Sequence, residues 1–350
     1  MVNKIEEDLD RKTELSNCNF VKTVLMLIVV FYHSILYWNG DWFTGEPAFP
    51  APLLGNFAEW MNTFHIYCFT LVSGYIFYYL KCEKEKYERF LPFLANKAKR
   101  LLIPYAAVSL AWVIPFAMYF FRYDATEIFV RFGLGTSPNQ LWFLLMLFFV
   151  FAIFHPLSKF FEKNTVGGAI VVLVFYGIGL FGPSFVPNVF QIFRAFMYLP
   201  VFWIGFKIRQ CGSRYLKKIP AVLWLLVHVL LFLLLKTVSA QEGTIYSLLR
   251  LGLAFLTNMV GAVMAFVILQ KLADRVKWQE NKPFAFLIKN AMPVYLFHQQ
   301  VVYVCIALLD GRIPSYLHAG VNFIGAMAVS LLLSALLMKF RFTKILIGEK

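Results

Sequence analysis

The sequence contains few charged residues, and few of those are acids. Charged residues make up 15% of the 350 positions, with 19 acids against 33 lysines and arginines, whereas hydrophobic residues make up 60% and aromatic residues 18%. The mean hydropathy is +0.67. A soluble domain of this length covers its core with a much more charged surface, so the composition excludes a soluble protein and predicts a polytopic membrane protein.

Motifs for several common chemistries are also missing. The sequence has no HExxH or CxxC spacing, which argues against a zinc site, and no GxSxG elbow of a serine hydrolase. No acidic residue lies in the central part of an apolar stretch, which argues against a proton-coupled transporter. There is no internal repeat, low-complexity linker or second soluble domain, so the chemistry is expected to lie in the helices and their short loops.

The apolar stretches predict an all-α transmembrane bundle of about ten helices. They cover roughly residues 20–38, 60–80, 101–121, 141–155, 167–182, 192–207, 220–236, 247–270, 291–309 and 320–338. Residues 1–18 lack the apolar core and cleavage site of a signal peptide and are predicted to form a cytoplasmic tail. The membrane domain is expected at 19–340 and a second cytoplasmic tail at 341–350.

The basic residues orient this bundle. The outer loops hold Arg122, Arg131, Lys236 and Arg312, helices hold Arg194 and Arg250, and all other lysines and arginines fall in segments assigned to the cytoplasm. Both termini are therefore predicted to be cytoplasmic in a multi-pass protein of the plasma membrane. The net charge of +14 follows from this topology and indicates no nucleic-acid partner. No cysteine lies in an outer loop, so no structural disulfide is expected.

Phe20–Trp38 is the stretch that bears most directly on function, because its apolar run carries His33. At about 1.5 Å per residue, His33 lies roughly 20 Å along the helix and toward its outer end. An ionisable side chain at that depth marks a functional interior site or a histidine bonded to a neighbouring helix. His65 lies at matching depth in the second stretch, and His298 follows Pro293 in VYLFHQQ. His155, His228 and His318 are interpreted as structural.

The loop from Lys81 to Arg100 is the second informative stretch. It ends in KAKRLLIPY, where Lys97 and Arg100 lie three residues apart and share a face if the helix extends to them. Two cations at the membrane surface suit a ligand that carries phosphate, although from this stretch alone ordinary positive-inside anchoring is the favoured explanation.

Together these segments resemble the integral membrane acyltransferase-3 family, in particular its sugar and polysaccharide O-acetyltransferases. NFVKTVLMLIVVFYHS is similar to the family's first helix with its essential histidine, and FHIYCFTLVSGYIF to its second-helix pattern. FLANKAKRLLIPY resembles the basic RxxR motif, QLWFLLMLF the LWFL motif and AMPVYLFHQQ the YLxH motif. Lys97 replaces the first arginine of RxxR, and Asn19 replaces a frequent aspartate.

The resemblance implies transfer of an acetyl group from acetyl-CoA to a hydroxyl of a saccharide, as in polysaccharide biosynthesis. It implies His33 as the general base, His65 as its catalytic partner, and Lys97 and Arg100 as ligands of the CoA phosphates. Trp142, His298 and Ser73 are candidates for the acceptor cavity. No bound cofactor or metal is expected, and acetyl-CoA is a co-substrate.

Several points stay open from the sequence. The acceptor is a saccharide or a lipid-linked glycan of undetermined identity, and a homo-oligomer is one alternative for the assembly. Cytoplasmic CoA reaches His33 through a cavity, or the acetyl group crosses on an acyl-enzyme. The competing hypotheses are a transporter or flippase for a lipid-linked saccharide and a polytopic glycosyltransferase, although the outer loops offer only scattered acids for the latter.

Overall fold

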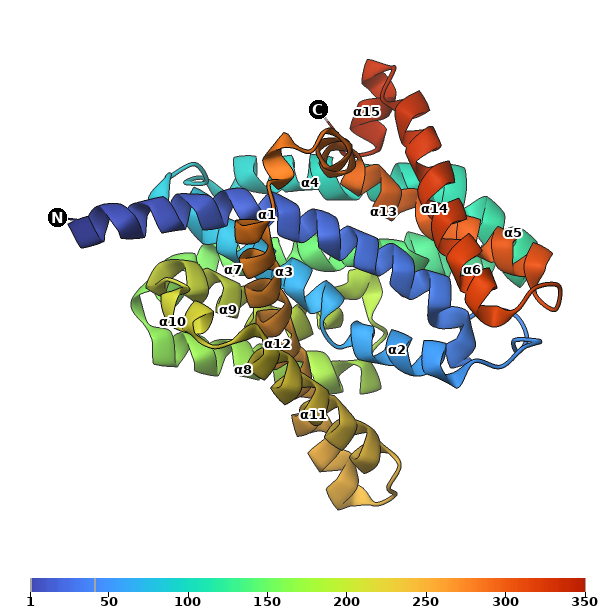
Figure 1. Ribbon diagram of the computed structural model, residues 1–350, viewed down its shortest axis with the longest axis horizontal. Helices are drawn as coiled ribbons and strands as arrows, with labels where there is room; N and C mark the ends of the chain where they lie inside the picture. Colours follow the sequence, from blue (N-terminus) through green and yellow to red (C-terminus); the bar gives the residue numbers. More distant parts are fainter. Residues whose placement is uncertain (1, 41, 350) are drawn as a thin grey trace. The chain divides into compact units, whose positions relative to one another are not determined.

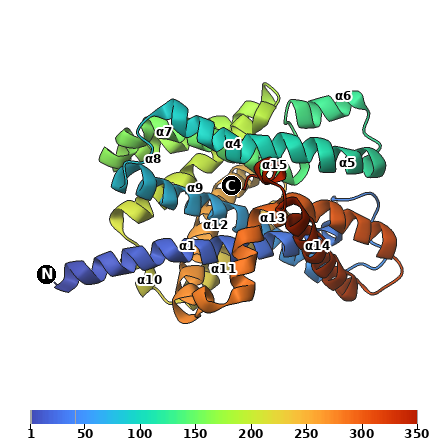
Figure 2. The ribbon, with the colours of Figure 1, turned by 90° about the horizontal axis from the view of Figure 1, so that it is seen from above.

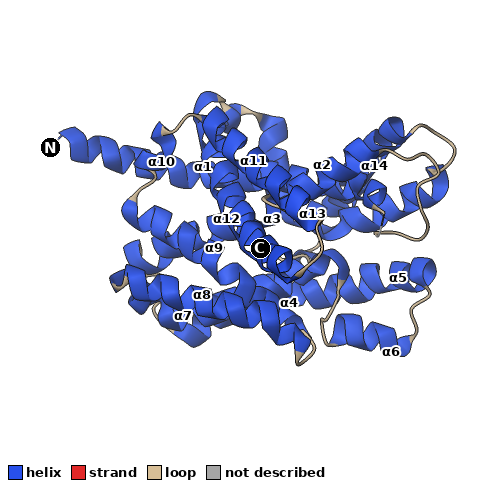
Figure 3. Ribbon diagram, turned by 90° about the horizontal axis from the view of Figure 1, so that it is seen from below, coloured by secondary structure: helices blue, strands red, loops and turns tan. Residues whose placement is uncertain are grey.

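The protein is described by a computed structural model that covers residues 2–40 and 42–349, with the side chains of 12–40, 42–213 and 215–349. The described residues form helices joined by short loops and contain no strand (Figure 3). Nine helical segments within this part of the chain are long and apolar enough to cross a membrane. The all-helical transmembrane bundle predicted from the sequence is confirmed, and the orientation of its termini stays a prediction.

The chain divides into two compact units, and four helices run from one unit into the other. Unit 1 comprises Met1–Val29, Phe57–Glu83 and Val201–Lys289, and unit 2 comprises Val30–Asn56, Lys84–Pro200 and Asn290–Lys350. The helices shared by the units are α1 (Val2–Ile35), α2 (Pro52–Asn62), α9 (Ile192–Cys211) and α13 (Lys282–Leu309).

Unit 1 also contains α3 (His65–Tyr78), a π-helical turn at Tyr79–Glu83, α10 (Arg214–Lys218), α11 (Ala221–Ser239), α12 (Thr244–Arg275) and a 3-10 turn at Trp278–Glu280. α11 and α12 form a hairpin, and α12 also packs on α3 (Figure 1).

The predicted second span is divided. α2 ends at Asn62 and α3 begins at His65. Between them Thr63 bonds the Trp60 carbonyl through both its hydroxyl, at 2.6 Å, and its backbone N–H, at 3.2 Å, in a tight turn.

α3 and α9 cross in unit 1 with their backbones in contact. A Cβ atom at Gly74 would lie 2.0 Å from the Phe202 carbonyl oxygen, and a Cβ atom at Gly205 would lie 1.9 Å from the Leu71 carbonyl oxygen. Each glycine therefore sits against the backbone of the other helix, and no side chain separates them. This crossing explains the glycine in the VSGY segment.

Unit 2 contains the following further elements: 3-10 turns at Leu36–Asn39, Asn139–Leu141, Gly182–Ser184 and Val189–Gln191, π-helical turns at Ser109–Val113 and Phe129–Gly133, α4 (Phe90–Val108), α5 (Ile114–Phe121), α6 (Ala125–Ile128), α7 (Trp142–Lys163), α8 (Thr165–Phe181), α14 (Ser315–Leu337) and α15 (Arg341–Leu346). α4 packs on α7 and on the short α15 (Figure 2). α4, the π-turn and α5 form one span from Phe90 to Phe121, in which Pro115 follows the π-turn.

The helix that begins the chain extends beyond its apolar run. α1 starts at Val2, well before the predicted membrane boundary at residue 19, and Glu14, Asn17 and Cys18 are buried. At the other end, residues 341–346 of the predicted C-terminal tail form α15 against α4. The segments assigned to tails therefore contribute packed helix to their units.

Candidate functional site

Two histidines from distant parts of the sequence meet in unit 2. His33 Nδ1 on α1 lies 3.0 Å from His298 Nε2 on α13, and the ring centroids are 4.9 Å apart. His298 is fully buried, whereas His33 is partly exposed. The sequence suggested a functional histidine on each helix but not their contact, which joins positions 265 residues apart.

Backbone acceptors determine which nitrogens of this pair carry protons. His298 Nδ1 lies 2.8 Å from the Tyr295 carbonyl oxygen and 3.1 Å from that of Val294. Carbonyl oxygens only accept, so His298 Nδ1 must carry a hydrogen, and in the neutral ring its Nε2 then carries a lone pair. That lone pair accepts the Nδ1 hydrogen of His33. In neutral His33 the basic lone pair is therefore on Nε2, which is the arrangement that a general base requires.

An aromatic group covers His33. The loop after α1 places the Trp42 ring 5.7 Å from the His33 ring and 4.9 Å from that of Tyr303 on α13. Phe43 stacks on Tyr303 at 5.1 Å. Trp42, whose ring is apolar and whose N–H is polar, therefore forms part of the surroundings of the imidazole.

Gln299 adds a polar group next to this aromatic cover. Its amide donates to the Tyr303 hydroxyl, and its Oε1 has no hydrogen-bond partner among the described residues, although the side chain is buried. A buried amide oxygen without a partner can only accept a hydrogen bond, so it is suited to binding a hydroxyl group. The sequence shows Gln299 and Gln300 directly after His298, but it does not show which groups their side chains bond.

The 3-10 turn before α7 holds α13 in position. Gln140 Nε2 donates to the Leu296 carbonyl at 3.0 Å and to Gln300 Oε1 at 2.7 Å, and the Tyr295 hydroxyl donates to the backbone carbonyl of Gln140. These bonds fix the turn of α13 that carries His298. Gln140 is thus a positioning residue that the LWFL segment alone did not reveal.

The basic end of α4 also lies in unit 2. Lys97 Nζ is 3.7 Å from the Phe151 ring centroid, and the rings of Phe93 and Tyr87 are 5.4 and 5.5 Å away. The ammonium therefore lies among three aromatic rings. Arg100 is exposed, and although burial raises the pKa of Tyr87, the Arg100 charge lowers it, which places that charge close to the same ring.

A match to a protein-family model identifies the family of the chain. The acyltransferase-3 model, described as an acyltransferase domain, matches residues 16–339. The chain belongs to the acyltransferase-3 family. No curated protein and no solved structure matches it significantly. The matched range nearly coincides with the predicted membrane domain at 19–340, and the chain is a multi-pass membrane acyltransferase.

The other residues predicted from the family resemblance have local roles in the structure. In unit 1, His65 Nδ1 donates to the Met61 carbonyl at 2.6 Å, and the Ser73 hydroxyl donates to the Phe69 carbonyl at 2.9 Å. In unit 2, the Trp142 ring lies 4.4 Å from the Arg194 guanidinium. Of the predicted site residues, unit 2 brings together His33 and His298, while Lys97 and Arg100 form a separate basic end.

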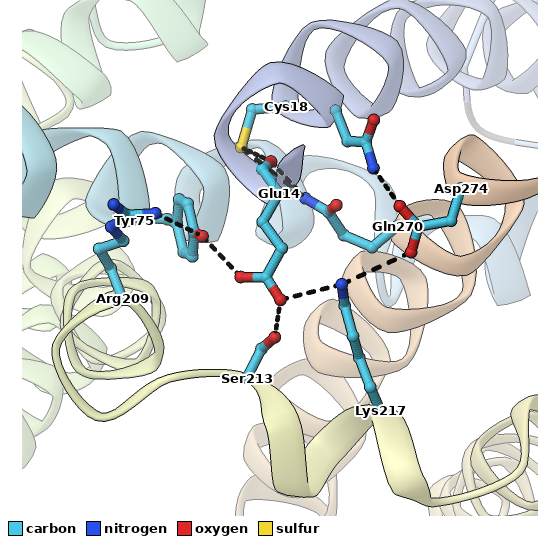
Figure 4. Close-up of polar contacts among 9 residues, drawn as sticks. Glu14, Cys18, Tyr75, Arg209, Ser213, Lys217, Gln270 and Asp274 are labelled. Atoms are coloured by element: carbon cyan, nitrogen blue, oxygen red, sulfur yellow. Dashed lines mark hydrogen bonds and ion pairs between the residues drawn. The ribbon is translucent and has the colours of Figure 1, made fainter. Parts of the chain in front are cut away.

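The acyltransferase also contains a buried polar cluster in unit 1, centred on Glu14 (Figure 4). Its carboxylate accepts from the Tyr75 hydroxyl at 2.7 Å and from the Ser213 hydroxyl, and it pairs with Lys217 at 2.9 Å. Arg209 donates to the Tyr75 hydroxyl at 3.1 Å.

Beside this cluster, Arg209 makes a bidentate pair with Glu83, with both distances 2.7 Å. These satisfied charges connect α1, α3, α9 and α10 and have a structural role.

Proposed function

We propose that this acyltransferase moves an acetyl group from acetyl-CoA to a hydroxyl of a saccharide, with His33 as general base. The His33–His298 contact supports this proposal most directly, because the backbone carbonyls of α13 orient His298, and His298 in turn orients His33. The same logic operates wherever a histidine base is held in one tautomer by a hydrogen-bonded partner. His298 is then a positioning residue.

The chemical step needs one proton carrier. His33 Nε2 takes the proton of the acceptor hydroxyl while the hydroxyl oxygen attacks the thioester carbonyl carbon. The resulting tetrahedral intermediate then collapses with cleavage of the carbon–sulfur bond. The imidazolium then returns the proton to the CoA thiolate. Gln299 Oε1 can only accept a hydrogen bond, so it is suited to binding another hydroxyl of the acceptor. In this scheme atoms and charges balance without a metal or a bound cofactor.

The geometry of α4 supports a donor whose phosphates lie at its Lys97 end. The span that begins near Lys97 and Arg100 reaches Trp112, whose indole nitrogen donates to the Phe297 carbonyl at 3.2 Å, next to His298. Trp112 follows Lys97 by fifteen positions, which corresponds to roughly 22 Å of helical rise. One continuous span thus links the proposed phosphate end to the histidine pair, which favours a pantetheine arm lying along it.

The test is transfer of radiolabelled acetyl from acetyl-CoA by the purified full chain in lipid nanodiscs. We expect labelled saccharide with the wild type and a loss of roughly 10²–10⁴-fold with His33→Gln at equal folded protein. His228→Gln is a matched control, because this buried histidine lies in unit 1 and bonds Thr63 at 3.0 Å. Full turnover by His33→Gln would exclude His33 as the base.

A further inference from the structure

A pocket of about 330 Å³ opens where α1 ends in unit 2. The 3-10 turn at Leu36–Asn39 forms one wall, the loop around Glu46 and Pro47 forms another, and the start of α2 at Gly55 and Asn56 closes it. The backbone turns at Gly40, whose φ of +104° favours glycine. The wall residue Trp38 lies in this 3-10 turn and follows His33 by five positions, or roughly 8 Å of helical rise.

The lining groups resemble those that bind a sugar ring. Trp38 offers an indole edge, Asn39 and Asn56 offer amides, Glu46 offers a carboxylate, and Pro47 adds apolar surface. Within the described part of the chain, the exposed side chains of Asn39 and Glu46 make no hydrogen bond or ion pair. Among the residues that the structure describes, no lysine or arginine lines the pocket, so an anionic ligand would meet the Glu46 carboxylate without a compensating cation. Amides and a carboxylate suit hydroxyl groups, and the apolar walls suit C–H faces.

The loop that forms one wall is held firmly. Asp310, which follows α13, accepts from the Tyr37 hydroxyl at 3.1 Å and from the Ala48 backbone N–H at 3.2 Å. The Phe49 carbonyl accepts from Trp38 Nε1 at 3.1 Å and from the Ser315 hydroxyl at 2.6 Å. The loop therefore has a defined conformation.

The same loop also contacts the base. Its Trp42 packs on His33, and its Glu46 and Pro47 line the pocket a few residues later. The pocket and the base are therefore connected through the 3-10 turn that follows α1 and through this loop, both within unit 2.

We infer that this pocket binds a neutral sugar ring of the acceptor and presents its hydroxyl groups toward His33. The inference rests on the proposed acyl transfer and specifies where and by which groups the acceptor is recognised. Glu46 and Asn39 are the specificity-determining residues. Glu46 selects neutral sugars over uronic acids by its charge.

The experiment measures transfer of labelled acetyl from acetyl-CoA to methyl hexosides, to methyl N-acetylhexosaminides and to a methyl glucuronide, using the full chain in nanodiscs. We expect Asn39→Ala and Glu46→Gln to raise the acceptor KM about 10-fold, the effect of one lost hydrogen bond, without changing the KM for acetyl-CoA. Glu46→Lys should shift the preference toward the glucuronide. Thr44→Ala, an exposed change in the same loop outside the pocket, is the matched control.

The outcomes separate the two proposals. If the wild type acetylates a sugar but the Asn39 and Glu46 variants retain its acceptor KM and its preference for neutral sugars, the pocket is not the acceptor site and the acyl transfer stands. If the wild type transfers no acetyl group to any sugar yet hydrolyses acetyl-CoA, the sugar-binding assignment is wrong. If acetyl-CoA is not turned over at all, the proposed donor chemistry itself fails.

Discussion

Replacing His298 tests whether this residue acts through His33. Leucine at position 298 fills the space with an apolar side chain of similar bulk. It removes His298 Nε2, the acceptor that lies 3.0 Å from His33 Nδ1. Glutamine keeps an acceptor, because its amide oxygen can take the same hydrogen. The pair of variants therefore separates loss of the hydrogen bond from the change of side chain.

The magnitudes follow from the roles assigned to the pair. One neutral hydrogen bond contributes about 0.5–1.5 kcal/mol, at most roughly 10-fold in rate. Loss of tautomer control in a serine-protease triad costs ~10⁴-fold. We therefore expect His298→Leu to lower kcat by roughly 10²–10⁴-fold and His298→Gln to stay within roughly 10-fold of the wild type.

The assay is labelled acetyl transfer at equal folded protein, with thermal stability recorded for each variant. The deciding measurement is the double variant His33→Gln/His298→Leu. If His298 acts only through His33, the double variant is no slower than His33→Gln alone, since the interaction has already been removed. Multiplicative losses, or a drop in His298→Leu that follows only the lost folded protein, would refute the reasoning.

Three further predictions concern the donor end, stability and topology. Removing the charge of Lys97 or Arg100 with glutamine should raise the KM for acetyl-CoA by roughly 10-fold or more and leave the acceptor KM unchanged, whereas equal effects on both would indicate membrane anchoring. Arg209→Met should lower the free energy of unfolding, followed by thermal melting in detergent, by about 3 kcal/mol, because it leaves the Glu83 carboxylate, which is 28% exposed, without its cation. An unchanged melting temperature would show that the Arg209–Glu83 pair does not stabilise the protein. An impermeant thiol reagent outside intact cells should label a cysteine placed at the exposed Thr44 and leave the exposed, natural Cys211 unlabelled, and labelling of Cys211 would reverse the predicted orientation.

The presence of histidines within apolar helices could be predicted from the sequence, but their pairing could not. Counting along apolar stretches placed His33 and His65 at matching depth, which favoured these two as partners. Depth says nothing about which faces of which helices meet, and His33 pairs with His298 because α13 packs on this side of α1 within unit 2. The His65 Nδ1 atom instead bonds the Met61 carbonyl, only four residues earlier in the sequence.

The helix boundaries show the same limit. An apolar stretch at 60–80 predicts one continuous helix, yet α2 ends at Asn62 and α3 begins at His65, with a tight turn at Thr63 between them. Likewise, acids near the N-terminus predict a solvated tail, whereas Glu14 is buried among partners that lie about 60 and 200 residues further along the chain. Long-range pairing of this kind leaves no local signal.

The backbone crossing of α3 and α9 affects how the protein is assembled during synthesis. α3 has 14 residues and spans only about 21 Å, less than the ~30 Å of a hydrocarbon core, and much of its surface is buried. Its glycine contact, Gly74 against Phe202, is with a helix made more than a hundred residues later. α3 therefore enters the membrane before the helix that fits against it exists. Completion of unit 1 must wait for α9 to be inserted, so a chain truncated between them should expose α3 to the cell's quality-control machinery.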